Sequence, residues 1–354
     1  MNSNTSVARV LGILAVSASL GCEDVSWPER EYVSSVRILG VRAEPPTLAP
    51  GATSELSVYC ADGRVAPNGD PSCDLEIAWF AACDNPPKND PTECYGTYAA
   101  WAKKLARNVT DTPVEDWPEG FGFGKTYRFQ APSTILSDTF EALGQTVHFG
   151  HSYVFFAACA GKLVATTGSS DRLPVECYDR ITGKALDQRA FTVGYTTIRS
   201  FDLVTNRNPT PVFPRMNHLQ YPTSCNTDAP CPSGFECTSD ATCSPVVARC
   251  DKNRPETCRG YCFDFGLASN DFLVFAKGGA QAKSVWIETF TNAGMLSNDP
   301  DFGVSPPQPG EAGTQIRCLG WRPPAVATEH AHLWAVVRDD FGGLAVWDQR
   351  ILVR

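Results

Sequence analysis

Fifteen cysteines are the feature that most restricts what this 354-residue chain can fold into. A reducing cytosol keeps thiols free, whereas exported proteins oxidise them to disulfides. No Cys-x-x-Cys pair occurs in the chain, and zinc sites are usually built from such pairs or from clusters of cysteine and histidine. We therefore expect an exported chain that is stabilised by disulfides and holds no structural zinc.

The cysteines divide into groups along the chain. After Cys22, six fall before residue 200 and eight fall after it. Both numbers are even, so we expect all fourteen to be oxidised within their own group, with Cys318 bridged to the segment 225–262. The connectivity stays open, except that the short loop favours a bridge between Cys83 and Cys94. The cysteines expected in disulfides are Cys60, Cys73, Cys83, Cys94, Cys159, Cys177, Cys225, Cys231, Cys237, Cys243, Cys250, Cys258, Cys262 and Cys318.

The segment 225–262 is a disulfide-rich insert by composition. It holds seven cysteines at regular spacing and only two aromatic residues, Phe235 and Tyr261. Such a stretch buries too little apolar surface to form a core and needs covalent cross-links. Its first part, CNTDAPCPSGFECTSDATC, resembles small EGF-like or knottin-type modules. The acidic residues that precede a calcium site are missing, so the resemblance implies no metal.

The N-terminus has the pattern of an export signal. Arg9 precedes an apolar run from residue 10 to residue 20, which as a helix is only about 16 Å long and too short to span a bilayer. The run ends in Ser19-Leu20-Gly21-Cys22, which resembles a bacterial lipoprotein signal. The resemblance implies that residues 1–21 are removed, that Cys22 carries lipid and that residues 22–34 form a tether. An ordinary secretory signal, cleaved nearby, is the alternative.

The rest of the chain predicts short strands. Glycine and proline are frequent, at 28 and 27 residues, and apolar residues alternate through 56–60, 75–79 and 333–337, which is the period of a half-buried strand. Tyr98, Trp101, Leu105 and Val109 recur at helical spacing and predict one short helix lying on a sheet. Residues 206–209 (Asn-Arg-Asn-Pro) should interrupt regular secondary structure, so we place a domain boundary there. The expected domains are 35–205 and 206–354, with the insert in the second.

Three residues and two sequence segments indicate which fold these strands form. Cys60, Trp79 and Cys159 follow the order expected of immunoglobulin-like sandwiches. Two segments resemble the first and last strands of immunoglobulin-like repeats in exported lipoproteins of myxobacteria and related bacteria. They are VRAEPPTLAPGATSELSV and LWAVVRDDFGGLAVWDQRILV. The resemblance implies an all-β chain of two immunoglobulin-like β-sandwich domains in the cell envelope, and it implies little about activity.

Catalytic and metal-binding motifs are weak. Residues 150–154 (GHSYV) are compared with the nucleophile elbow GxSxG, but valine replaces the last glycine, so we do not expect Ser152 to be a nucleophile. The pairs His148/His151 and His330/His332 have no third potential ligand at the sequence spacing of a known metal site, so we expect no metal there. Asn298, Asp299 and Asp301 could contact calcium or form a turn, and we expect the turn.

These observations predict a non-catalytic, lipid-anchored binding or structural protein of the bacterial envelope. Its expected partners are the membrane, through the lipid, and another envelope protein or polymer. No cofactor is expected, and the net charge of −9 argues against nucleic acid as a partner.

The alternative functions are a hydrolase or hydrolase accessory acting on envelope or environmental polymers, and an insert used as a protease inhibitor. Carboxylates converging on a cleft would favour an enzyme, whereas an aromatic-lined face would favour binding. We expect these side chains not to share one cleft: His148, His151, Ser152, His330 and His332.

Overall fold

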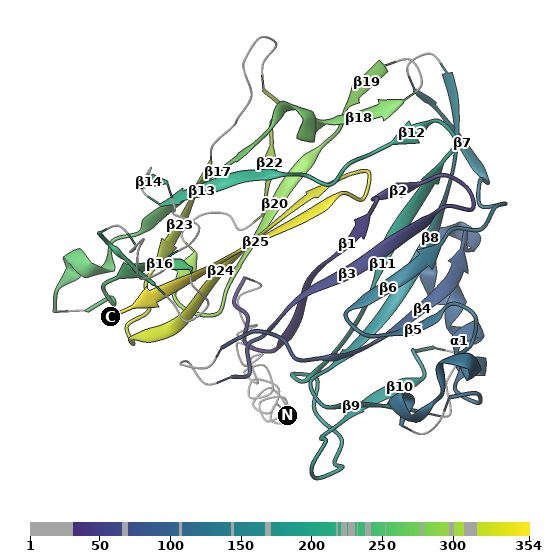
Figure 1. Cartoon of the computed structure of the whole chain (residues 1–354), viewed down its shortest axis with the longest axis horizontal. Helices are drawn as coiled ribbons and strands as arrows, with labels where there is room; N and C mark the ends of the chain where they lie inside the picture. The colour runs from purple at the N-terminus through teal and green to yellow at the C-terminus, as the bar shows by residue number, and fades with distance from the viewer. Residues whose placement is uncertain are drawn as a thin grey trace, which may run out of the picture. The chain divides into compact units, whose positions relative to one another are not determined.

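The computed structural model describes residues 31–354 except 66–69, 106–107, 143–144, 167–170, 217–218, 221–224, 226–230, 232, 238–241, 252, 277–278, 297–300 and 308–316. These residues form an all-β chain of two immunoglobulin-like sandwiches with a disulfide-rich segment in the second (Figure 1), as predicted. Among them, no helix has the length and apolar character needed to cross a membrane. The predicted signal and Cys22, the predicted site of lipidation, lie outside the described residues.

The first sandwich has two principal sheets. The smaller has the strand order β1 (Val36–Glu44), β3 (Thr53–Asp62), β6 (Thr126–Gln130). The larger has the order β2 (Thr47–Leu48), β11 (Phe191–Phe201), β8 (Gln145–Cys159), β4 (Glu76–Asp84), β5 (Phe121–Phe123), and β7 (Asp138–Ala142) also pairs with β8. A separate hairpin consists of β9 (Lys162–Ala165) and β10 (Val175–Tyr178).

Strand β4 and the C-terminal part of β8 are buried on both faces. Trp79 and Phe156 point into the core between the two sheets, together with residues of β1 and β3. Their neighbours Phe80 and Phe155 belong to a second cluster on the outer face. Successive side chains of a strand point to opposite faces, so each of these strands contributes to both clusters.

The outer cluster is covered by inserted elements. Tyr98 and Trp101 of the helix α1 (Tyr95–Trp101) pack in this cluster. The prediction of a short helix on the sheet is therefore confirmed. The predicted helical pattern continued to Val109, but the helix ends at Trp101 and Val109 starts a separate 3-10 turn. The 3-10 turns of this half are η1 (Pro87–Asn89), η2 (Pro91–Cys94), η3 (Val109–Asp111) and η4 (Val114–Asp116).

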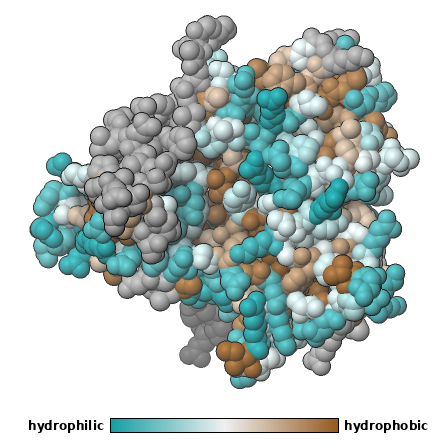
Figure 2. All heavy atoms as spheres, in the orientation of Figure 1, coloured by the Kyte–Doolittle hydropathy of each residue, from teal (hydrophilic) through white to brown (hydrophobic). Residues whose placement is uncertain are grey.

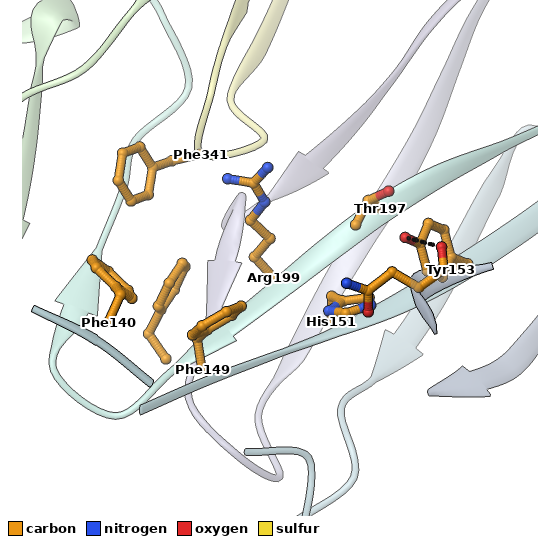
Figure 3. A pocket seen from close by; sticks show the side chains of 9 residues that line it. Phe140, Phe149, His151, Tyr153, Thr197, Arg199 and Phe341 are labelled. Atoms are coloured by element: carbon orange, nitrogen blue, oxygen red, sulfur yellow. Dashed lines mark hydrogen bonds between the residues drawn. The ribbon is translucent and has the colours of Figure 1, made fainter. Parts of the chain in front are cut away.

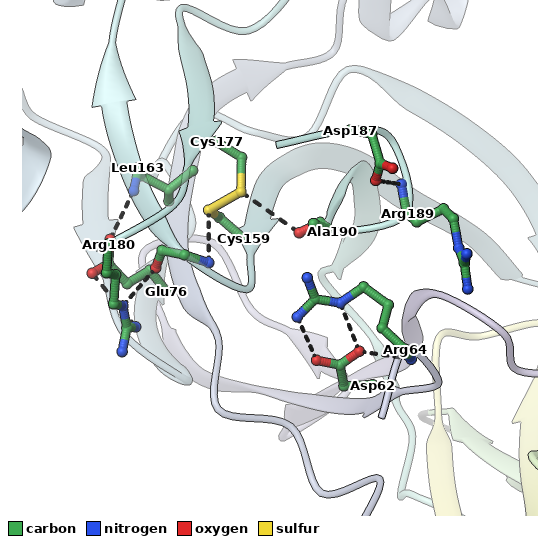
Figure 4. Close-up of a disulfide and its surroundings, with 11 residues drawn as sticks. Asp62, Arg64, Glu76, Cys159, Leu163, Cys177, Arg180, Asp187, Arg189 and Ala190 are labelled. Atoms are coloured by element: carbon green, nitrogen blue, oxygen red, sulfur yellow. Dashed lines mark hydrogen bonds and ion pairs between the residues drawn. A yellow bond between two sulfur atoms is a disulfide. The ribbon is translucent and has the colours of Figure 1, made fainter. Parts of the chain in front are cut away.

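Disulfides attach these covering elements to the sheet. The Cys159–Cys177 bridge joins the end of β8 to β10 (Figure 4), and the backbone amide of Gly161 donates to Cys159 Sγ at 3.2 Å. The Cys83–Cys94 bridge, which the short loop favoured, joins β4 to the turn before α1. Cys60 bonds to Cys73. The bridged pairs therefore do not connect Cys60 with Cys159, although Trp79 lies in the core as the predicted order implied.

The second sandwich also has two principal sheets, and a small third sheet adjoins them. One has the order β14 (Leu219–Gln220), β13 (Pro211–Met216), β17 (Tyr261–Leu267), β23 (Arg317–Arg322), β21 (Met295–Leu296). The other has the order β15 (Phe235–Cys237), β16 (Cys243–Val247), β25 (Leu344–Val353), β24 (Thr328–Asp339), β20 (Val285–Thr291), β22 (Asp301–Val304). The third has the order β12 (Val204–Thr205), β18 (Leu273–Ala276), β19 (Gly279–Ala282), and the 3-10 turns are η5 (Pro255–Cys258) and η6 (Ser269–Phe272).

Trp321 is the fully buried tryptophan of the second core, whereas Trp286 on β20 is half-buried. The insert is less separate than its composition indicated. Its strand β16 pairs in parallel with β25, and its last residues begin the core strand β17. Its bridges are Cys225–Cys237, Cys231–Cys243 and Cys250–Cys258. Cys262 is disulfide-bonded, while the side chain of Cys318 lies outside the described residues.

Two predicted boundaries need correction. The tether was placed at 22–34, but Tyr32 pairs with Thr291 of β20 and Val33 is buried, so the chain is folded from about residue 31. The second domain was expected to begin at 206. However, β12 already pairs with β18 at Val204 and Thr205, so the chain passes to the second half slightly earlier. In both places a backbone hydrogen-bond partner distant in the sequence decides the boundary.

The two sandwiches share a buried junction. An apolar cluster spans it, with Val33, Leu39 and Ala61 from the first half and Phe290, Trp334, Val336 and Leu344 from the second. Beside it, Lys283 Nζ donates to Asp339 Oδ2 and Asn206 Oδ1, each at 2.6 Å. Asn208 Nδ2 donates to the Ala43 carbonyl, and Asn208 Oδ1 accepts from the Leu344 amide. The segment read as a breaker is therefore a hydrogen-bonded connection between the sandwiches.

Candidate functional site

A cavity lies on the outer face of the larger sheet of the first sandwich. Strands β8 and β11 pair so that Phe149 lies opposite Phe201, His151 opposite Arg199, and Tyr153 opposite Thr197. Within each strand these residues alternate, so all six side chains share one face. Together with Asn89, Phe140 and Phe341 they line a space of about 460 Å³.

Phenylalanines form one end of this cavity (Figure 3). Phe140 comes from β7, Phe149 from β8 and Phe201 from β11, while Phe341 comes from the turn between β24 and β25 of the second sandwich. Ring centroids lie 5.6 Å apart for Phe140 and Phe149 and 5.9 Å apart for Phe201 and Phe341. These spacings suit edge-to-face and tilted aromatic packing, and the cluster forms an apolar wall that needs both sandwiches.

Arg199 provides the positive charge of the cavity. Its side chain lies between the phenylalanines and the polar end formed by Thr197, His151 and Tyr153 (Figure 3). Its Nη1 donates to the backbone carbonyl of Asp340. A guanidinium has five N–H donors in a planar fork, so the group keeps further donors for an acidic ligand. The contact with Asp340 holds the side chain at the mouth of the cavity.

His151 is the titratable group of the polar end. Only 7% of the residue is exposed, and its Nε2 is buried without a hydrogen-bond partner among the described residues. Burial lowers the pKa of His151; Arg199 lowers it further, although Asp138 opposes the shift. Its backbone amide donates to Asn85 Oδ1 at 2.9 Å, which fixes the strand there. The lowered pKa favours the neutral form of the imidazole.

The cavity exists because the inserted elements stop short of it. Farther along β8, Phe155 and the other residues of this face are covered by α1 and its neighbours, whereas 149–153 are left open. On β11 the same face continues to Val193 and Tyr195, each 52% exposed. Figure 2 shows hydrophobic residues gathered at the upper right, where Figure 1 places β7 and β12. Val193 and Tyr195 therefore continue this face of β11 beyond the cavity as partly exposed apolar side chains.

Of the residues singled out from the sequence, His151 is the one that lines this cavity. His148 is exposed, and its backbone amide donates to Asp202. Ser152 is buried on the opposite face of β8, where its hydroxyl donates to Asp84 Oδ1. His330 and His332 lie on β24 of the second sandwich. These five side chains therefore do not share one cleft among the described residues.

Other side chains that could bind a metal ion are in disulfides or lie outside the described residues. The sulfurs of Cys225, Cys231 and Cys243 lie within 4.8 Å of one another, which is a spacing compatible with a metal ion. All three, however, are in disulfides, and a metal-binding cysteine must be a free thiolate. Asn298 and Asp299, and the side chain of Asp301, lie outside the described residues.

Arg199 and the lining phenylalanines were not among the residues predicted from the sequence. The signal was present as two alternating runs, Phe149-x-His151-x-Tyr153 and Thr197-x-Arg199-x-Phe201. Each run reads as an ordinary strand, because alternation is what any half-buried strand shows. Only the pairing of β8 with β11 places the two runs side by side.

Comparisons with protein families and with curated proteins find no match. Among solved structures, the chain is similar to Escherichia coli alpha-2-macroglobulin activated by porcine elastase, at 9% identity and a TM-score of 0.22, over 93% of this chain and 22% of that one. It is also similar to the Yersinia pseudotuberculosis adhesin InvE, at 10% identity and a TM-score of 0.18, over 90% and 60% of the two chains. This chain therefore spans less than two thirds of either structure, and similarity at this level assigns no function.

Proposed function

We propose that the chain is a non-catalytic, lipid-anchored protein of the bacterial cell envelope that binds another envelope protein through the cavity between β8, β11 and the turn at Phe341. The anchor rests on the sequence pattern that ends at Cys22 and on the resemblance to exported lipoproteins. The observation that supports binding is the cavity lining, in which aromatic rings surround one guanidinium.

The lining also indicates the chemistry of the ligand. The phenylalanines offer an apolar pocket, and Arg199 lies next to them with free donors. A peptide segment with a hydrophobic side chain beside a carboxylate satisfies both parts, because apolar burial supplies affinity and a charge-assisted hydrogen bond fixes the orientation. Hydrolysis of a polymer would instead call for a paired acid and base at the cleft, whereas the lining supplies rings and a cation.

The binding proposal is tested by cross-linking on intact cells. A photoreactive amino acid replaces Thr197 inside the cavity and, in a matched control, replaces Ile181, which is 94% exposed on a distant turn. We expect a discrete cross-linked protein from position 197 that position 181 does not give. Adding Arg199→Ala or Phe149→Ala should abolish that product. Equal products from both positions, or a product that survives both variants, would overturn the proposal.

The anchor is tested separately. Mass spectrometry of the mature protein should find lipid on Cys22, and Cys22→Ser should move the protein into the soluble fraction, because it removes the thiol that would carry the lipid. An unmodified N-terminus at another residue would refute the anchor. The cavity proposal would then stand on its own cross-linking result.

A further inference from the structure

His330 and His332 converge at the start of β24. They are separated by one residue on the strand, and one ligand atom of each lies within 4.8 Å of the other. Asn292 holds the backbone between them, since its side-chain amide donates to the His330 carbonyl and its oxygen accepts from the His332 amide. The imidazole pair is therefore fixed by the strand and by a side chain that contacts both residues.

The first sandwich supplies a carboxylate to this pair. Asp70 lies near the end of the loop that the Cys60–Cys73 disulfide closes, and one of its oxygens is within 4.8 Å of a ligand atom of each histidine. Its Oδ1 accepts from the Ser72 amide at 2.8 Å, which orients the group. Asp70 and the histidines are about 260 residues apart in the sequence, so the sequence could not indicate this third ligand.

Two ring nitrogens at this place are buried and have no hydrogen-bond partner among the described residues. They are Nδ1 of His330 and Nε2 of His332. Buried polar atoms are nearly always hydrogen-bonded, so a pair of such atoms beside a carboxylate points to a missing ligand. The other nitrogen of His332, Nδ1, lies 2.7 Å from Asp348 Oδ1. A carboxylate behind a histidine is the usual support of a metal-binding imidazole.

We propose that Asp70, His330 and His332 bind one divalent transition-metal ion of the zinc type, with Asp348 orienting His332. Two imidazoles and one carboxylate are ligands that Zn²⁺ takes in three-ligand sites, which leave the fourth position to water or to a partner. Ligand atoms of a tetrahedral zinc lie about 3.4 Å apart, so a small shift of the exposed Asp70 carboxylate would complete the site. The ion would attach that loop of the first sandwich to β24 of the second.

The test is zinc binding to the purified full chain after treatment with a chelator. Isothermal titration calorimetry with Zn²⁺ should give one ion per chain, and Co²⁺ should give the visible absorption of a tetrahedral site. Asp70→Asn and His330→Gln should each weaken zinc binding at least 100-fold, and Asp348→Asn should weaken it about 10- to 100-fold. The matched control is His148→Gln, which changes an exposed histidine of the other sandwich and should leave the affinity unchanged.

A second readout is the thermal stability of the chain. Because the ion binds only the folded chain, saturating Zn²⁺ should raise the Tm of the wild type, and the rise should be lost in Asp70→Asn. Failure of the wild type to bind zinc would overturn the proposal. So would zinc binding that Asp70→Asn and His330→Gln leave unchanged. Neither result bears on the aromatic cavity, which shares no residue with this site.

Discussion

At the scale of single residues, His151 should make the stability of the fold depend on pH. Its pKa is lowered in the folded chain, first by burial and then by Arg199. The unfolded chain therefore binds more protons once the pH falls below about 6.5, so the free energy of unfolding decreases as the pH drops through that range. We expect His151→Phe, which keeps the aromatic lining, to reduce the loss of stability between pH 7.5 and pH 5.5, measured by urea denaturation.

The matched variant for His151 is His148→Phe, three residues earlier on the same strand. His148 is exposed and does not line the cavity, so its replacement controls for the loss of any histidine from this strand. His330 also has a lowered pKa, so some dependence should remain in His151→Phe. Equal pH dependence in His151→Phe and the wild type would contradict this prediction.

At the scale of elements, the hairpin turn between β24 and β25 is built around a buried ion pair. The side chains of Lys283 and Asp339 are 1% and 0% exposed, with Nζ and Oδ2 2.6 Å apart. Asp339 Oδ1 also accepts from the amides of Phe341 and Gly343, which form the turn. Lys283→Met removes the cation and leaves the carboxylate buried, so we expect the free energy of unfolding to fall by about 3–5 kcal/mol in urea denaturation.

An exposed ion pair provides the comparison for Lys283→Met. Arg172 and Glu176 lie 3.6 Å apart with side chains 65% and 38% exposed, and such pairs contribute about 1 kcal/mol or less. Arg172→Met should therefore change the stability very little. Similar small effects of both methionine variants would show that the buried pair does not stabilise the turn.

The hairpin β9–β10 depends on a covalent connection to the sheet. Cys159 and Cys177 are both buried and close a loop with a sequence separation of 18. Replacing both by alanine should lower the free energy of unfolding by about 3 kcal/mol, because the unfolded chain gains loop entropy. Hydrogen exchange should quicken first in residues 162–178. Unchanged exchange in this hairpin would contradict the role assigned to the bridge.

At the scale of the whole described unit, the two sandwiches should unfold together. They share the apolar cluster around Trp334 and the hydrogen bonds of Asn206 and Asn208. Calorimetry should therefore give one transition whose van't Hoff and calorimetric enthalpies agree. Trp334→Ala, at the junction, should lower the Tm of the entire transition, with a cost of about 3–5 kcal/mol. Two separate transitions in the wild type would contradict a shared junction.

Local patterns were sufficient for the strands, the helix on the sheet and the class of fold. Alternation around Trp79 and Leu333 requires only near neighbours in the sequence. The bridge between Cys83 and Cys94 was also predictable, because its loop is short. The helix boundary was less accurate, since the apolar spacing of Leu105 and Val109 continues through residues that pack on the same cluster without being part of the helix.

The candidate sites could not be predicted in the same way. The cavity needs the register that sets His151 opposite Arg199, and the proposed metal site needs Asp70 beside His330. In both cases the partners come from distant parts of the chain. The sequence therefore determined by itself what a count or a short local pattern can give: the number of cysteines, the strand periodicity and the expectation of export from the N-terminal pattern. Tertiary structure decided which faces stay open and which side chains meet, because strand pairing and packing join segments that no local pattern connects.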